Sequence, residues 1–185
     1  GIITFDEELT TIGAYAFSEC FSLTSITIPS SVTSIGEYAF ENCSSLTSVI
    51  IPSSVTSFGV GAFFGCSSLP NITIPNSVKS IDDYAFGACS SLTSITIPSG
   101  VTYIGNGAFS GCPLTSITIP NSVTTIGYYA FYNCSNLTNI TIPDSVTKIG
   151  FRAFCNCSSL VSITIPDKVT NIYYSTFYNC SSLTN

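Results

Sequence analysis

Histidine is absent from the 185 residues, and its absence removes much of the catalytic chemistry open to proteins. Histidine is the commonest general base and the commonest metal ligand, so Ser-His-Asp catalysis, Cys-His catalysis and most zinc sites are excluded. The remaining carboxylate candidates are the Asp82-Asp83 pair, Asp144 and Asp167, which lie in separate parts of the chain with no base or metal partner. We therefore expect a protein that is not an enzyme and that holds no cofactor and no metal.

Basic residues are also scarce. The chain has 4 Lys and Arg against 10 Asp and Glu, and its net charge is −6. Without a basic block, this balance is the wrong sign for a phosphate backbone or an anionic membrane surface. No apolar run approaches the roughly 18 residues of a membrane-spanning helix. We expect no nucleic-acid partner and no direct insertion into a membrane.

A 23-residue repeat runs through the whole chain. Its period, with a single step of 22, is given by the cysteines and prolines at Cys20, Cys43, Cys66, Cys89, Cys112, Cys134, Cys157, Cys180, Pro29, Pro52, Pro75, Pro98, Pro120, Pro143 and Pro166. The short step falls at Cys112-Pro113-Leu114, where other units read Cys-x-x-Leu. Such a period is typical of a solenoid. We expect one array over residues 1–185, with about eight units, entered and left in mid-unit and belonging to a longer protein.

Each unit combines extended segments with one compact segment. Residues 94–97 alternate polar and apolar side chains before Pro98, which predicts a strand with one buried face, and Ile3-Thr4-Phe5 aligns with that strand. Residues 101–104 repeat the extended signature. In residues 39–43 the apolar side chains at i, i+1 and i+4 predict a single helical turn. Successive units should stack in register as parallel strands about 4.8 Å apart.

A glycine closes the Val-Thr-x-Ile segment in most units. The glycines of this column are Gly13, Gly36, Gly59, Gly105, Gly127 and Gly150. Their recurrence predicts a backbone turn with positive φ, which glycine adopts without a Cβ penalty. Asp82 and Tyr173 depart from the column, and Thr176 replaces an otherwise constant alanine in the same unit as Tyr173. We expect residues 171–178 to follow a different path or to form the least protected interior unit.

The strand pattern resembles that of leucine-rich repeats. Leu46-x-x-Val49-x-Ile51 is similar to their L-x-x-L-x-L segment, and the 23-residue length with I-P-x-S-V-T-x-I-G and A-F-x-x-C resembles the BspA-like subclass over the whole chain. The resemblance implies a horseshoe with a parallel β-sheet on the concave side and short helical turns on the convex side. It also implies a cell-surface or secreted adhesion protein, because the family is known for surface proteins of host-associated bacteria and parasitic protists.

The outward strand positions are the first candidates for partner binding. They include Asn71, Thr73, Ser94, Thr96, Ser116, Thr118, Asn139 and Thr141. This surface has no Trp, Tyr or Arg, the residues that favour tight binding sites, so weak multivalent contact with protein or glycan ligands of a host matrix or cell surface fits it better. The alternative is that these hydroxyls only supply cross-strand hydrogen bonds and solubility.

Aromatic residues form the second candidate group, in variable positions of the last three units. They are Tyr128, Tyr129, Tyr132, Phe151, Tyr173, Tyr174 and Tyr178. Such a group is typical of a partner or self-association patch. The alternative is that the tyrosines lie flat over neighbouring units and cover the core.

The ends of the array and its thiols complete the expectations. Ile3, Phe5 and the unit after Cys180 have no polar cap, which predicts self-association through open strand edges. The eight cysteines of one column are expected to be buried, reduced thiols that act as small hydrophobes. Cys155 lies outside that column and is expected to face away from it, either as an exposed reactive thiol or as an inert one.

Two alternatives to an adhesion module remain open. Regular columns of Thr and Ser are also typical of a flat ice-binding or crystal-binding surface, which a curved array would not support. The other alternative is a purely structural spacer.

Overall fold

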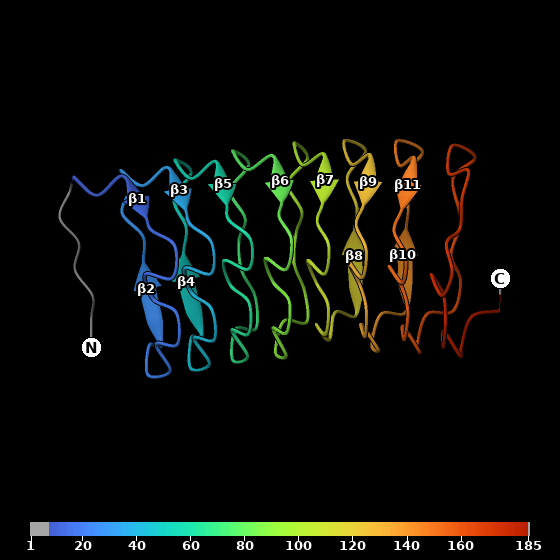
Figure 1. Ribbon diagram of the computed structural model, residues 1–185, viewed down its shortest axis with the longest axis horizontal. Coiled ribbons are helices and arrows are strands. Elements are labelled where there is room, and N and C mark those ends of the chain that lie inside the picture. The colour runs from blue at the N-terminus through green and yellow to red at the C-terminus, as the bar shows by residue number, and fades with distance from the viewer. Residues whose placement is uncertain (1–7, 185) are drawn as a thin grey trace.

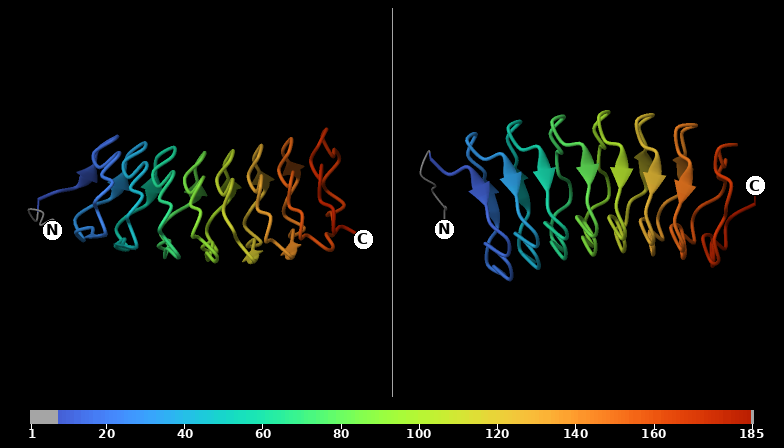
Figure 2. Two further views of the ribbon diagram at one scale, coloured as in Figure 1. Left: turned by 90° about the horizontal axis from the view of Figure 1, so that it is seen from below. Right: turned by 45° about the horizontal axis from the view of Figure 1, so that its top comes forward.

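The computed structural model describes residues 8–184 as a β-solenoid of stacked units, and this stretch contains no helix. Figure 1 shows the units side by side in an almost straight row from the N-terminal to the C-terminal end, and the two further views in Figure 2 agree. The parallel-strand solenoid expected from the repeat is confirmed, whereas the expected helical turns are wrong. The strand expected at Ile3–Phe5 lies outside the described residues.

Two series of short strands run along the array. Face strands are β2 (Ser25–Thr27), β4 (Ser48–Ile50), β8 (Ser116–Thr118) and β10 (Asn139–Thr141). Corner strands are β1 (Thr11–Ile12), β3 (Ser34–Ile35), β5 (Ser57–Phe58), β6 (Ser80–Ile81), β7 (Tyr103–Ile104), β9 (Thr125–Ile126) and β11 (Lys148–Ile149). All pairings are parallel and in register, so that Ile117 lies opposite Ile140 and Ile81 opposite Ile104. The 23-residue period therefore places equivalent side chains in columns.

The columns form one hydrophobic core. Its largest side chains are the phenylalanines of the A-F-x-x-C segment, whose rings stack from unit to unit at centroid distances between 5.1 Å for Phe17–Phe40 and 5.8 Å for Phe86–Phe109. Phe40, Phe86 and Phe109 are fully buried. A unit of 23 residues cannot bury these rings alone, so the stability of each unit depends on its neighbours.

The compact segment is a pair of tight turns rather than a turn of helix. Tyr38 has a φ of 50° and Asn42 a φ of 54°, both in the left-handed region. Ala39 and Glu41 donate their N–H groups to carbonyls three residues earlier, while Tyr38, Phe40 and Asn42 donate theirs to the next unit at 2.7–2.8 Å. Alternate N–H groups thus bond within and between units. A helix directs all of these groups along its own axis and could not make the bonds between units.

The glycine column has a different cause from the one expected. Positive φ occurs at Gly61, Gly65, Gly107 and Gly111, and not at the glycines that follow Val-Thr-x-Ile. A Cβ on Gly127 would lie 2.6 Å from the amide nitrogen of Asn106 and 2.6 Å from the carbonyl carbon of Gly105 in the preceding unit. Glycine is required because two backbones approach closely there, so the prediction of a left-handed turn is wrong.

The corner-strand ladder is interrupted at the two units that lack this glycine. The described corner strands form one sheet of β1, β3 and β5 and another of β6, β7, β9 and β11, and the break precedes Asp82. After β11 no further corner strand forms in the described chain, and the next unit carries Tyr173. Ile172 and Tyr173 are 50% and 42% exposed. The expected departure of this unit is confirmed at its corner, although Ser175 keeps the positive φ of its turn, at 58°.

A half-buried serine hydroxyl links most successive units. Serines of the I-P-x-S-V segment donate to a backbone carbonyl of the preceding unit, as Ser54 does to Val32 at 2.6 Å and Ser145 to Val123 at 2.7 Å. Gly100 occupies this position in one unit. A Cβ there would come close only to the flexible end of Lys79, whose Nζ is 2.8 Å away and can move aside, and it would lie in ordinary contact with the Asn76 carbonyl oxygen at 3.8 Å.

Gly100→Ser is therefore expected to stabilise the array. The new hydroxyl would restore the bond to the preceding unit, and the loss of glycine lowers the entropy of the unfolded chain, for a gain of about 1 kcal/mol in the free energy of unfolding. Urea denaturation would measure the gain. Ser145→Ala is the matched comparison, and it should lower the free energy of unfolding by about 1 kcal/mol. A Gly100→Ser protein no more stable than wild type would contradict this role of the serine column.

Candidate functional site

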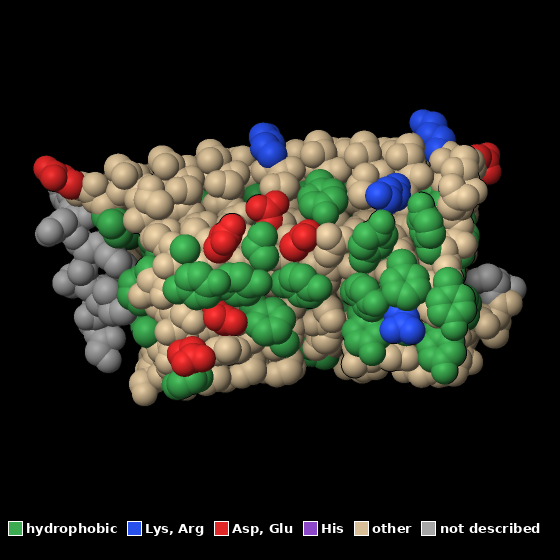
Figure 3. Space-filling view, viewed as in Figure 1, with side chains coloured by type: hydrophobic (Ala, Val, Ile, Leu, Met, Phe, Trp, Pro, Cys, Tyr) green, Lys and Arg blue, Asp and Glu red, His purple; other side chains and the backbone are tan. Residues whose placement is uncertain are grey.

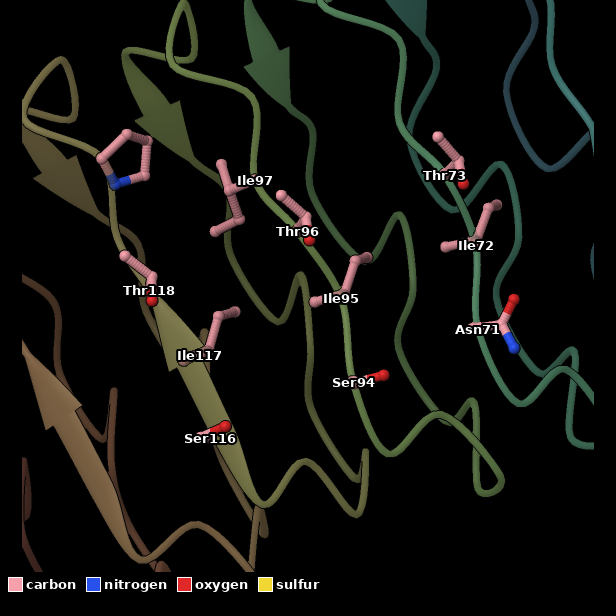
Figure 4. A pocket seen from close by; sticks show the side chains of 11 residues that line it. Asn71, Ile72, Thr73, Ser94, Ile95, Thr96, Ile97, Ser116, Ile117 and Thr118 are labelled. Atoms are coloured by element: carbon pink, nitrogen blue, oxygen red, sulfur yellow. The ribbon is translucent and has the colours of Figure 1, made fainter.

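The outward positions of the face strands lie on one exposed surface. All eight candidates of that surface are exposed, while the isoleucines between them point into the core. Figure 4 shows the central part, in which the side chains of Asn71, Thr73, Ser94, Thr96, Ser116 and Thr118 come from three successive units. They line a shallow hollow of about 480 Å³, here called the face hollow.

The face hollow coincides with interruptions of the face-strand ladder. Pro70 stands where other units have a residue whose N–H donates to the preceding unit, and proline has no N–H to give. Residues 71–73 are joined to the next unit only by an isolated bridge between Thr73 and Thr96. Among the described strands, β8 pairs with β10 and not with residues 94–96, next to the unit shortened by one residue. The face hollow thus lies where the face strands do not form one continuous ladder.

The chemistry of the face hollow is uniform. Its polar groups are hydroxyls and the Asn71 amide, and its apolar floor is formed by isoleucines such as Ile95 and Ile117. No charged side chain lines it. Groups of this kind suit an uncharged polar ligand that both donates and accepts hydrogen bonds.

The tyrosines lie on another surface, formed by the tight turns and here called the turn face. At its C-terminal end the guanidinium of Arg152 stacks on Phe151 at 5.0 Å, Phe151 meets Tyr129 edge-on at 5.5 Å, and it stacks with Tyr174 at 6.2 Å. Tyr174 and Tyr178 are 79% and 65% exposed. Figure 3 shows the resulting surface, a basic group surrounded by hydrophobic side chains. We call Tyr128, Tyr129, Tyr132, Phe151, Arg152, Tyr174 and Tyr178 the aromatic patch.

The N-terminal half of the same face is acidic, as Figure 3 also shows. Its carboxylates are Glu19, Glu37, Glu41, Asp82 and Asp83. Tyr38, Glu41, Phe64 and Tyr84 line a hollow of about 240 Å³, here called the turn hollow. The ring of Tyr38 lies over Gly61, since a Cβ on Gly61 would come within 2.3 Å of it. Tyr38 therefore covers a neighbouring unit.

Two carboxylates beside the turn hollow are held by the fold. Asp83 accepts hydrogen bonds from the backbone N–H of Asn106 at 2.7 Å, from its side-chain amide at 2.9 Å and from the Tyr103 hydroxyl at 3.2 Å. Burial raises the pKa of Asp82. Burial also raises the pKa of Tyr103, and the charge of Asp83 adds to the effect.

The thiols are structural rather than reactive. All nine cysteines are free, and each column thiol from Cys43 onward donates to the carbonyl of a phenylalanine in the preceding unit, as Cys89 does to Phe63 at 3.2 Å. Cys155 lies outside the column as expected but is only 3% exposed, so an exposed thiol there is excluded. Burial raises the pKa of the Cys155 thiol, and the positive charge of Arg152 partly offsets the rise.

Metal and membrane sites are not found in the described part of the chain. Residues 8–184 contain no group of three or more Cys, Asp or Glu side chains that could hold a metal ion. The same residues include no helix long and apolar enough to cross a membrane.

Two elements of the surface were missed by sequence reasoning. Arg152 is at the centre of the aromatic patch, and Gly61, at the equivalent position of an earlier unit, lies under the Tyr38 ring that lines the turn hollow. Both residues occupy the position two residues after the glycine column, where half of the units have Tyr. A comparison of this position from unit to unit would have shown the contrast.

Comparisons with known proteins agree with the geometry. The family described as BspA type leucine-rich repeat region matches residues 2–112 and 58–184, whereas no curated protein matches the sequence. A leucine-rich repeat protein of T. pallidum is similar in structure, with a TM-score of 0.76, 30% identity and coverage of 82% of this chain and 72% of that one. A leucine-rich repeat protein from Bacteroides ovatus shows a TM-score of 0.71 and 36% identity over 95% of this chain and 40% of that one.

A third similar structure is described as a leucine rich cell surface protein from Faecalibacterium prausnitzii. It has a TM-score of 0.67 and 32% identity, and the match covers 96% of this chain and 56% of that one. The chain thus spans about half the length of the second and third proteins.

Proposed function

Because the chain belongs to the BspA-type leucine-rich repeat family, we propose that it is a non-catalytic binding module of a surface or secreted protein. Its ligands are protein or glycan chains that contact the face strands through many weak, repeated interactions. The observation that carries this proposal is the face hollow, an exposed and uncharged surface whose hydroxyls recur from unit to unit. The description of the Faecalibacterium prausnitzii relative as a cell surface protein supports the location.

The hydroxyl columns are too irregular to favour an ice-binding or crystal-binding surface. Lattice matching requires evenly spaced groups, whereas the described face strands are divided between β2–β4 and β8–β10. Ile50 also interrupts the Thr column, and Asn71 and Asn139 interrupt the Ser column. The break between the two strand pairs coincides with the face hollow, a feature that a pure spacer would not need.

The test displays many copies of the chain on beads and measures the binding of these beads to a panel of matrix proteins and glycans. Thr96→Arg fills the centre of the face hollow and is expected to reduce binding about tenfold or more, because weak contacts act together. Thr102→Arg is the matched control, since Thr102 is exposed on the corner side outside the hollow. Equal binding by the wild type and Thr96→Arg, or no binding to any member of the panel, would count against the proposal.

A further inference from the structure

The turn face has opposite charges at its two ends. Five carboxylates lie in its N-terminal half, and Lys148 and Arg152 lie in its C-terminal half. The Nζ of Lys148 is 5.6 Å from the Tyr128 ring centroid, so both cations are associated with the aromatic patch. We propose that two copies of this chain pair through their turn faces in antiparallel orientation, so that the aromatic patch of each copy covers the turn hollow of the other.

The repeat itself sets the register of this pairing. The position two residues after the glycine column is occupied in successive units by Tyr15, Tyr38, Gly61, Tyr84, Gly107, Tyr129, Arg152 and Ser175. The two-fold axis lies between the two turn faces, runs along the unit of Gly107 and is perpendicular to the row of units. It exchanges units that lie equally far before and after the unit of Gly107. Each column then meets the same column of the partner copy. Arg152, two units after Gly107, comes opposite Gly61, two units before it.

Shape is complementary at this contact. Gly61 is buried under the ring of Tyr38, and the turn hollow opens beside that ring, between Tyr38, Phe64 and Tyr84. Arg152 is the long side chain of the same column in the other half of the face. Aromatic residues and Arg are enriched in protein interfaces, where an anchor of one partner fills a pocket of the other.

Charge is complementary at the same contact. The Nε of Arg152 is buried without a hydrogen-bond partner, and its guanidinium stacks on Phe151. The turn hollow offers the carboxylate of Glu41, which can form charge-assisted hydrogen bonds to a guanidinium. The same axis brings Tyr174 opposite Glu37, where a phenol can donate to a carboxylate.

The pairing is closed, and its contact is long. From Glu37 to Tyr174 the contact spans seven units, which at about 4.8 Å per step is about 30 Å. A specific interface covers about 800 Å² of each partner. Because both copies use the same surface, assembly stops at a dimer, unlike end-to-end stacking of open arrays, which continues.

Charge reversal tests the pairing by sedimentation across a range of protein concentrations. The wild type is expected to form dimers, and Arg152→Glu or Glu41→Arg alone is expected to raise the dimer dissociation constant about tenfold or more. An equimolar mixture of the two variants should recover dimers, because in the mixed dimer the two substituted side chains meet in one turn hollow and the native Arg152 and Glu41 meet in the other. Thermal unfolding would verify that both variants fold. If one of them does not fold, Tyr174→Glu replaces it, because this substitution places a like charge opposite Glu37.

Lys168→Glu is the matched control for Arg152→Glu, because it changes the net charge by the same amount outside the turn face and should leave the dimer unchanged. A monomeric wild type would overturn the proposal. So would larger oligomers that Arg152→Glu does not alter, which indicate association through the ends of the array, or a mixture that stays monomeric. The proposal is supported if dimers form in the equimolar mixture and in neither variant by itself, while Lys168→Glu forms dimers like the wild type.

Discussion

Raising the pH above 9 is expected to unfold the array. Burial raises the pKa of Cys43 to about 11 and the pKa values of Cys112 and Cys157 to about 12, and the thiol of each is fully buried. An unfolded thiol has a pKa of about 8.5, so the unfolded chain releases protons at a pH where the folded chain keeps them. The stability from each thiol is complete below the unfolded pKa and is lost as the pH rises toward the folded pKa.

The size of this effect follows from the number of thiols. Each buried thiol lowers the free energy of unfolding by about 1.4 kcal/mol per pH unit within that window. Three thiols alone would lower the free energy of unfolding by about 4 kcal/mol per pH unit, whereas the whole free energy of unfolding of a protein is typically about 5–15 kcal/mol. We expect the folded state to be lost before pH 11.

Urea denaturation at pH 7, 9 and 10 would measure the slope of stability against pH. Cys112→Ala should reduce that slope by about one proton, because one buried thiol is gone. Ile140→Val is the comparison, since it removes a core methylene, costs about 1 kcal/mol at every pH and should leave the slope unchanged. If Cys112→Ala left the slope unchanged, ionisation of the column thiols would not be the cause of alkaline unfolding.

Gly127→Ala is expected to destabilise the array by about 3 kcal/mol, which is the upper part of the range for overpacking. The new Cβ would lie 2.6 Å from backbone atoms of Asn106 and Gly105, and neither can move without breaking the hydrogen bonds between units. For a chain of this length the melting temperature should fall by about 10 °C.

Gly13→Ala provides the matched control for this substitution. It lies in the same column, but a Cβ at Gly13 meets nothing within 4 Å. We expect Gly13→Ala to change the free energy of unfolding by no more than about 0.5 kcal/mol. If Gly127→Ala and Gly13→Ala lowered the melting temperature equally, the cause would be the backbone propensity of alanine and not the contact between units.

The sequence by itself determined the columns of the fold. The 23-residue period places each Ile, Phe and Cys against its own kind in the next unit, and a 23-residue unit cannot bury Phe109 without neighbours on both sides. Alternation in residues 94–97 also separated the exposed hydroxyls from the core, so the candidate residues of the face strands were predictable. The family followed from the same pattern.

Only the tertiary structure decided how the backbone passes between units. Apolar residues at i, i+1 and i+4 are compatible with a helical turn and with the tight turns around Tyr38, and the choice depends on hydrogen bonds to the next unit. The glycine column likewise depends on a backbone 22 or 23 residues away. Burial of Cys155, the face hollow beside Pro70 and the setting of Arg152 all arise from side chains in adjacent units. Contacts distant in the chain but adjacent in space have no local signature in the sequence, which is why the stacked array was needed to reveal them.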